Sequence, residues 1–268
     1  MIMPGSIDLI VSTVYIGVTI WIAYWLRLYA LFYLDSYPLT RILVLEFIAT
    51  AELCGACFEL IIIADNWGVW MYAFYLFLLT IWWSTNWDEA SACPYTHMED
   101  IVIRKKPLTV AFLSICAELA GGFIIFRYIQ MLWALQFAST HKNRAYGDCT
   151  TDLQVSVITG ALVECIATCV CRVVSRILGD LNPRFSTIID AFVGTSLVVA
   201  AFNYTGGYFN PALATSLKYG CLGTSSLEHV MVYWIGTCIG SIASLRVYRM
   251  PFIQNFIQQQ ESTATLYS

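Results

Sequence analysis

The chain has 268 residues, of which 59% are hydrophobic and only 12% are charged, and its mean hydropathy is +0.68. Because soluble domains usually carry about 25% charged residues, this composition predicts an integral membrane protein that lies in a lipid bilayer. The net charge of −4 comes without a basic tract, which argues against a nucleic-acid partner. Most of the ten cysteines lie within apolar runs, where cysteine packs as a small hydrophobic residue, so we expect no metal site and no cofactor.

Seven stretches are apolar over the roughly 20 residues that a membrane-spanning helix needs. In chain order they are 7–33, 41–64, 69–88, 108–137, 154–178, 186–205 and 229–249. The first has neither a basic start nor a small-residue cleavage site, which favours a retained helix over a signal peptide. We therefore expect an all-α protein with one transmembrane domain over 1–250, followed by a polar tail at 251–268.

Two shorter segments, 91–100 ("SACPYTHMED") and 206–220 ("GGYFNPALATSLKYG"), lie between these spans. In each, a proline follows a small hydrogen-bonding residue, and proline suits the first position of a helix. About ten helical residues extend roughly 15 Å, half of a hydrocarbon core of about 30 Å. The sequence therefore predicts two half-helices, each of which enters and leaves the membrane on one side.

The two halves of the chain repeat each other. The pattern Glu-x-Ile-Ala-Thr at 46–50 recurs at 164–168, and the glutamate precedes the half-helix proline by 48 residues in the first half and by 47 in the second. Each half, 41–137 and 154–249, has three spans, so the halves must have opposite orientations. Inverted repeats are typical of channels and transporters, whose solute site lies where broken helices meet.

A pore that passes both half-helix tips would meet the partial positive charge of two helix N-termini, which repels cations and protons but admits neutral polar solutes. A passive channel is therefore the first hypothesis. A secondary transporter is the alternative, although such proteins usually carry charged residues at the site, and neither tip has an acidic residue. An enzyme would need a convergent set of acids, histidines or a cysteine–histidine pair, and we predict no catalytic residue.

Basic residues are distributed unevenly between the two sides of this layout. Ten lie on the side that the positive-inside rule assigns to the cytosol, and three lie on the other, Lys142, Arg144 and Lys218. The C-terminus is then cytosolic. The ten are Arg27, Arg41, Arg104, Lys105, Lys106, Arg172, Arg176, Arg184, Arg246 and Arg249.

The Asn-Pro-Ala motif at 210–212 resembles the signature of the aquaporins, and 232–241 ("VYWIGTCIGS") is similar to their last helix. With the repeat and the spacing, the resemblance covers about 41–250. The replaced first signature, Cys93-Pro94-Tyr95, and the long N-terminal helix resemble the unorthodox intracellular aquaporins. This resemblance implies a channel for water and small neutral solutes, such as glycerol and hydrogen peroxide, with one pore in each protomer of a homotetramer in an intracellular membrane, the endoplasmic reticulum, rather than the plasma membrane.

The resemblance also implies which residues line the pore. The half-helix tips are Cys93, Pro94, Tyr95, Asn210, Pro211 and Ala212. The selectivity filter falls at Ala73, Val198, Gly207 and Leu213. Leu213 stands where water-selective members have an arginine, so this filter would be apolar and strict water selectivity is in doubt.

Buried acids have structural roles in this interpretation. We expect Glu46 and Glu164 to accept N–H donors from the half-helix loops rather than to relay protons. Glu52, Glu59 and Glu118 should pair locally, Glu118 with Arg127.

Other candidates are weaker. The spacings in 97–100 ("HMED") do not place its side chains on one helix face, which argues against a metal cluster there. Gly121 and Gly122 could serve close packing in an oligomer. A Cys149–Cys221 disulfide would require an oxidising lumen, and this question stays open.

Overall fold

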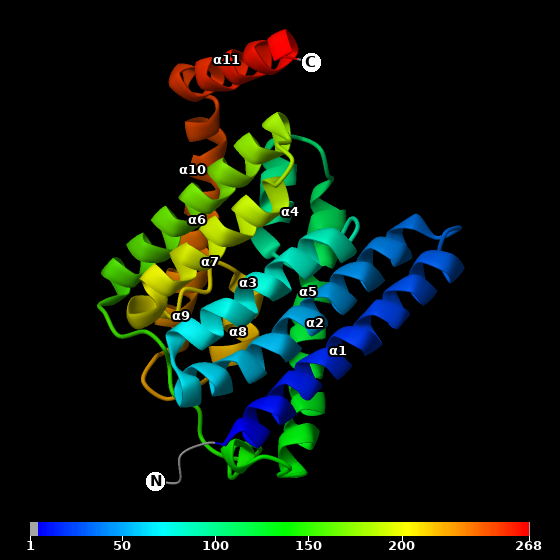
Figure 1. The fold of residues 1–268 in the computed structure, drawn as a ribbon, viewed down its shortest axis with the longest axis vertical. Coiled ribbons are helices and arrows are strands. Elements are labelled where there is room, and N and C mark those ends of the chain that lie inside the picture. The colour runs from blue at the N-terminus through cyan, green and yellow to red at the C-terminus, as the bar shows by residue number, and fades with distance from the viewer. Residues whose placement is uncertain (1–4, 268) are drawn as a thin grey trace.

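A computed structural model describes residues 5–267, with the backbone alone at 261 and 263–267. Long helices run side by side in one bundle that encloses two short helices (Figure 1). The long ones are α1 (Ser6–Tyr33), α2 (Pro38–Trp67), α3 (Val69–Asn86), α5 (Leu108–Ala134), α6 (Val157–Leu181), α7 (Ser186–Thr205) and a last, continuous segment. That segment comprises α9 (Ser226–His229), the π-helix η2 (Val230–Gly236) and α10 (Thr237–Tyr248). The short ones are α4 (Pro94–Val102) and α8 (Pro211–Lys218), and α11 (Pro251–Tyr267) follows the bundle.

Six of the described helical segments are long and apolar enough to cross a membrane. They correspond to six of the seven predicted spans. The remaining one, α3, has only 18 residues and ends in Ser84, Thr85 and Asn86, which lower its hydropathy. The helix packs between α2 and α7, and Ser84 and Thr85 at its polar end stay exposed and bond to backbone oxygens of their own helix.

Glycines allow the helices of each half to approach closely. A Cβ atom on Gly121 of α5 would lie 2.4 Å from the backbone oxygen of Phe47 in α2, and one on Gly240 of α10 would lie 2.1 Å from that of Cys165 in α6. A Cβ on Gly122 would similarly meet the Ser216 hydroxyl of α8. The expectation that Gly121 and Gly122 serve an oligomer contact is therefore wrong, because both are used inside the protomer.

The N-terminal helix is fixed to the bundle by a buried ion pair. Arg27 of α1 donates to Glu52 of α2, and both side chains are at most 2% exposed. The same carboxylate accepts the indole N–H groups of Trp82 at 3.1 Å and Trp87 at 3.0 Å. Arg27, which the sequence places with the cytosolic charges, is instead an interior residue. Its burial is possible because Glu52 neutralises it.

The other interior acids find partners far away in sequence. Glu59 accepts the Trp133 indole N–H at 2.6 Å and lies 3.3 Å from His141 Nε2. The predicted pair between Glu118 and Arg127 is wrong. Arg127 donates to Gln130, three residues further along its own helix, while Glu118 points to α4 and contacts its histidine.

The polar tail is helical. Pro251 begins α11, and the following residues contain neither proline nor glycine. Figure 1 shows α11 extending from the end of α10, away from the bundle. One side of the helix is buried at Ile257, whereas Phe252 is exposed.

A disulfide joins Cys149, in the loop before α6, to Cys221, just after α8. Their Cα atoms lie 4.9 Å apart. Beside the bridge, the Thr151 N–H donates to the Leu222 oxygen and the Leu222 N–H donates to the Cys149 oxygen, both at 2.9 Å. The connection fixes the long loop over one end of the bundle.

Replacing both Cys149 and Cys221 by serine should lower the free energy of unfolding by about 2–4 kcal/mol, because a cross-link of this kind restricts the unfolded chain. Thermal unfolding in detergent, with and without reductant, measures this effect. Reductant should lower the unfolding temperature of the wild type but not of the double variant. Cys116→Ser, at an exposed free cysteine, is the control and should behave as the wild type. Equal responses of the wild type and the double variant would contradict the prediction.

Candidate functional site

The tips of the two short helices are joined at the centre of the bundle. Asn210 caps α8 with its side-chain oxygen, which accepts the N–H groups of Ala212 at 3.0 Å and Leu213 at 3.2 Å. Its side-chain nitrogen donates to the backbone oxygen of Ala92 at 2.7 Å. Since Ala92 lies two residues before Pro94, this bond connects the start of α8 to the start of α4. One N–H of the amide remains for another partner.

The corresponding residue of the first half makes no such bridge. Cys93 occupies the N-cap of α4, is 6% exposed and makes no side-chain capping bond. A thiol is only a weak donor and acceptor. The two tips therefore share a backbone geometry but differ in the one side chain that reaches across.

Glu46 fixes the loop that leads into α4. Its carboxylate accepts the N–H of Ser91 at 3.0 Å and that of Ala92 at 2.9 Å. Ala92 has φ of +50°, a left-handed conformation that is costly for a residue with a side chain. The charged hydrogen bonds help to offset that cost.

Glu164 fixes the second loop in the same way. It accepts the N–H of Tyr208 at 3.3 Å and that of Phe209 at 2.8 Å, together with the Thr205 hydroxyl at 2.6 Å. Phe209 has φ of +46° and directly precedes Asn210, as Ala92 directly precedes Cys93. The internal repeat of the sequence is thus a repeat of backbone conformation and of its anchor.

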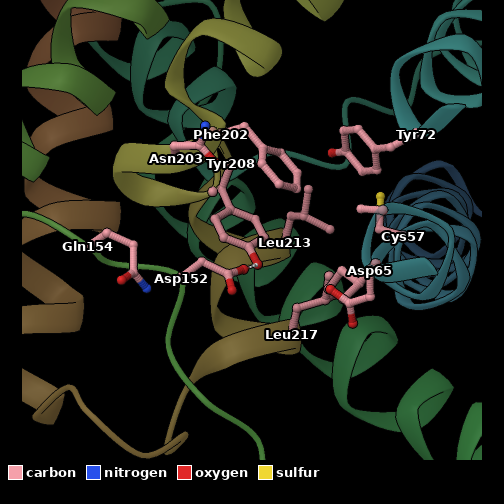
Figure 2. Close-up of a pocket in the computed structure, with 14 residues that line it drawn as sticks. Cys57, Asp65, Tyr72, Asp152, Gln154, Phe202, Asn203, Tyr208, Leu213 and Leu217 are labelled. Atoms are coloured by element: carbon pink, nitrogen blue, oxygen red, sulfur yellow. Dashed lines mark hydrogen bonds between the residues drawn. The ribbon is translucent and has the colours of Figure 1, made fainter. Parts of the chain in front are cut away.

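A hollow lies on each side of the joined tips. The outer one is bordered by α2, α3, α7, α8 and the 152–154 loop, and its lining includes Tyr72, Gly207, Tyr208 and Leu213 (Figure 2). The inner one is bordered chiefly by α4, α6 and the loops around α4, and its lining includes Glu46 and His97. The tips therefore separate two solvent-sized spaces.

The outer hollow has an apolar side and a polar side. Tyr72 and Phe202 approach with ring centroids 5.2 Å apart, and Leu213 lies beside them (Figure 2). On the polar side the Tyr208 hydroxyl donates to Asp152 at 2.5 Å. Lys218 pairs with the same carboxylate at 2.8 Å, which neutralises the charge at this end.

Three of the four predicted filter residues lie together here. Gly207 and Leu213 line the outer hollow, and a Cβ on Gly207 would lie only 2.7 Å from the Val198 oxygen. Ala73 does not line it and instead faces a groove between α3 and α7. Successive helix residues are about 100° apart, so Tyr72 points into the hollow where Ala73 points away.

The outer hollow is also less apolar than the predicted filter residues suggest. Tyr208, Asp152 and Gln154 are not among the predicted filter residues, although all three line the outer hollow. The signal that could have found them is weak, because Asp152 and Gln154 lie in a loop whose path the hydropathy pattern does not determine.

The inner hollow contains a charged network that holds α4. Glu99 accepts from Arg172 Nε at 2.9 Å, from Arg176 at 2.5 Å and from the Ser241 hydroxyl at 2.5 Å. These partners belong to α6 and α10. His97 points to the opposite side of α4, where its Nε2 lies 3.2 Å from Glu118. The residues of 97–100 therefore do not converge on one another, as their spacing predicts.

None of the protein-family profiles compared with the chain matches it. Individual relatives do. Aquaporin-11 of Milnesium tardigradum is 29% identical over 218 residues, which are 80% of this chain and 78% of the relative. Aquaporin-12 of Mus musculus is 26% identical over 233 residues, with the same shares. Among solved structures, the aquaglyceroporin from Plasmodium falciparum aligns with a TM-score of 0.49 and 16% identity, over 90% of this chain and 99% of that one.

The likeness to aquaporin-11 and aquaporin-12 extends over four fifths of the chain. It agrees with the inverted repeat, the Asn-Pro-Ala cap of α8 and the six membrane-capable helical segments. These relatives also support a channel rather than an enzyme. The chain is therefore similar to aquaporin-11 and aquaporin-12 along most of its length.

Proposed function

We propose that the protein is a passive channel for water and small neutral solutes, with glycerol and hydrogen peroxide among them, and that the pore lies within each protomer. The observation that carries this proposal is the hydrogen bond from Asn210 to Ala92. This bond joins the two half-helix tips, and the joined tips lie between the outer hollow and the inner hollow. A solute that moves from one hollow to the other must pass Asn210 and Cys93.

The charges around this path favour neutral solutes. Two helix N-termini place partial positive charge at the centre, which opposes cations and protons. The carboxylates of Glu46 and Glu164 are used by the backbone N–H groups of the loops. Asp152 in the outer hollow is neutralised by Lys218.

The outer hollow also suits an amphipathic solute. Tyr72, Phe202 and Leu213 offer an apolar surface, while Asn203 and Gln154 offer amide groups. Glycerol has carbon-bound hydrogens and hydroxyl groups that could use the two sides at once. This arrangement supports glycerol-like solutes in addition to water.

The disulfide supports one orientation of the protein in the membrane. Disulfides persist in oxidising compartments, so the Cys149–Cys221 bridge supports a lumenal or extracellular position for that end. The last helix then carries α11 to the cytosolic side. Together with the resemblance to intracellular aquaporins, this supports a place in the endoplasmic reticulum membrane. Family resemblance further supports a homotetramer with four separate pores.

Solute flux through reconstituted protein tests the proposal. Proteoliposomes should show water and glycerol permeation that needs no ion or proton gradient and rises linearly with solute concentration. Empty liposomes and liposomes with heat-denatured protein are the controls. Saturation of the flux, or its dependence on a gradient, would instead indicate a transporter.

Cys93→Asn should raise water permeability by roughly twofold to tenfold, because a second amide would supply a donor worth about 0.5–1.5 kcal/mol and a tenfold rate change corresponds to about 1.36 kcal/mol. Stopped-flow light scattering on equal amounts of reconstituted protein measures this. Cys93→Ala removes the thiol without adding a donor and should leave permeability near that of the wild type. An alanine variant as fast as the asparagine variant would refute the role of the donor.

Leu213→Arg should lower glycerol permeability relative to water permeability. The guanidinium would add a cation and several donors to the apolar side of the outer hollow, where Asp152 is within the same lining. The ratio of the two permeabilities is measured on one batch of vesicles. Leu213→Met, which keeps an apolar side chain of similar size, should preserve the ratio. If both variants keep it, Leu213 does not face the path of the solute.

A further inference from the structure

Behind the first half-helix, three side chains that can bind metals converge from three different helices. They are Glu46 of α2, His97 of α4 and Glu118 of α5, and each is at most 2% exposed. Their ligand atoms all lie within 4.8 Å of one another. His97 Nε2 lies 3.2 Å from Glu118 Oε1 and 3.4 Å from Glu46 Oε1.

One oxygen of this cluster lacks a partner. Glu118 Oε2 is buried and accepts no hydrogen bond from any residue that the structure describes. Leaving a buried carboxyl oxygen without a hydrogen-bond partner is costly. By contrast, Glu46 Oε2 is used twice by the loop N–H groups, and its Oε1 faces His97. The carboxylate of Glu118 is therefore the group that most needs an additional cation or donor.

The charge of the cluster also favours an additional cation. With neutral His97, the one cation that contacts the cluster among the described residues is Lys106, whose Nζ lies 2.8 Å from His97 Nδ1. The two buried carboxyl groups must therefore either keep a proton or leave a negative charge uncompensated. A divalent cation in contact with both carboxylates would neutralise them completely.

We propose that Glu46, His97 and Glu118 form a binding site for a divalent transition metal ion of the Zn²⁺ class. One imidazole nitrogen and two carboxylate oxygens are typical ligands for such ions. Bonds of about 2.0–2.2 Å in a tetrahedral geometry separate neighbouring ligand atoms by roughly 3.3–3.6 Å. The two distances from His97 Nε2 are close to that range. Because Glu46 and His97 line the inner hollow, the ion can enter from it, and a water can provide the fourth ligand.

Lys106 competes with the metal for this site. Its ammonium group can only donate, so His97 Nδ1 accepts and Nε2 carries the proton. A metal on Nε2 requires the proton to be on Nδ1 instead, which expels the ammonium. Lys106 is partly exposed and lies only 3.6 Å from Asp100, so that carboxylate can receive it. Metal binding then exchanges one cation for another without leaving either unpaired.

Zinc titration of tag-free protein in lipid nanodiscs, against a chromophoric chelator, tests the site. We expect one Zn²⁺ per protomer in the wild type and affinity lowered at least about tenfold in His97→Gln and in Glu118→Gln, since even changes outside the ligand set cost 10–100-fold. Lys106→Met should bind Zn²⁺ more tightly. The control is His229→Gln, at a buried histidine that contacts Thr215, and it should bind as the wild type. Elution volume and unfolding temperature without metal verify that each variant is folded.

Cobalt provides a readout that separates this site from the free cysteines. Co²⁺ bound to one nitrogen and oxygen ligands should show visible absorption bands without a thiolate charge-transfer band, and His97→Gln should abolish them. A thiolate band would assign the ion to cysteines and overturn the proposal. Zn²⁺ binding by His97→Gln and Glu118→Gln with wild-type affinity would overturn it as well. Neither readout depends on solute flux, so a failure of the metal-site proposal would not contradict the channel proposal.

Discussion

The architecture depends on how two loops satisfy their backbone polar groups inside the membrane. Hydrocarbon offers no hydrogen-bond partners, and each unsatisfied N–H costs several kcal/mol. In both halves a glutamate from a neighbouring long helix supplies the acceptor. Glu46 of α2 serves the loop before α4, and Glu164 of α6 serves the loop before α8. These bonds allow the left-handed residues Ala92 and Phe209, which turn the chain so that each half-helix starts at the centre. Without the two carboxylates, neither tip could lie there.

Much of this arrangement can be predicted from the sequence because it depends on local chemistry. The prolines and their spacing from Glu46 and Glu164 indicate the half-helices, and hydropathy indicates the spans. The predictions that fail concern contacts between residues on different helices. Arg27 of α1 resembles a loop cation in the sequence, but it pairs with Glu52 of α2. Ala73 is displaced from the outer hollow by the angle of a single helical step. Glu118 faces α4 rather than Arg127, because α5 presents it to the half-helix.

The two half-helices are held by different kinds of contact. On α8, Asn210 caps the start, and further along the helix the Thr215 hydroxyl accepts the Trp234 indole N–H at 2.9 Å. These contacts are neutral hydrogen bonds. On α4, the start has no side-chain cap. Glu99 forms ion pairs with two arginines on one side, and the neutral His97 is hydrogen-bonded to Glu118 on the other. The two half-helices therefore have similar backbone conformations but are stabilised by different kinds of interaction.

This asymmetry explains how the first tip tolerates a cysteine. A side-chain cap typically contributes about 1 kcal/mol, whereas breaking a buried ion pair costs about 3–5 kcal/mol. The position of α4 is thus determined mainly by the ion pairs of Glu99, which lies within about two turns of Cys93, with a further contact from His97, and only weakly by the capping residue. Once those anchors fix the helix, the side chain at its start is released from a structural role. Cys93 can then differ from Asn210 in hydrogen bonding without displacing the tip, so that the chemistry at the centre varies while the scaffold remains the same.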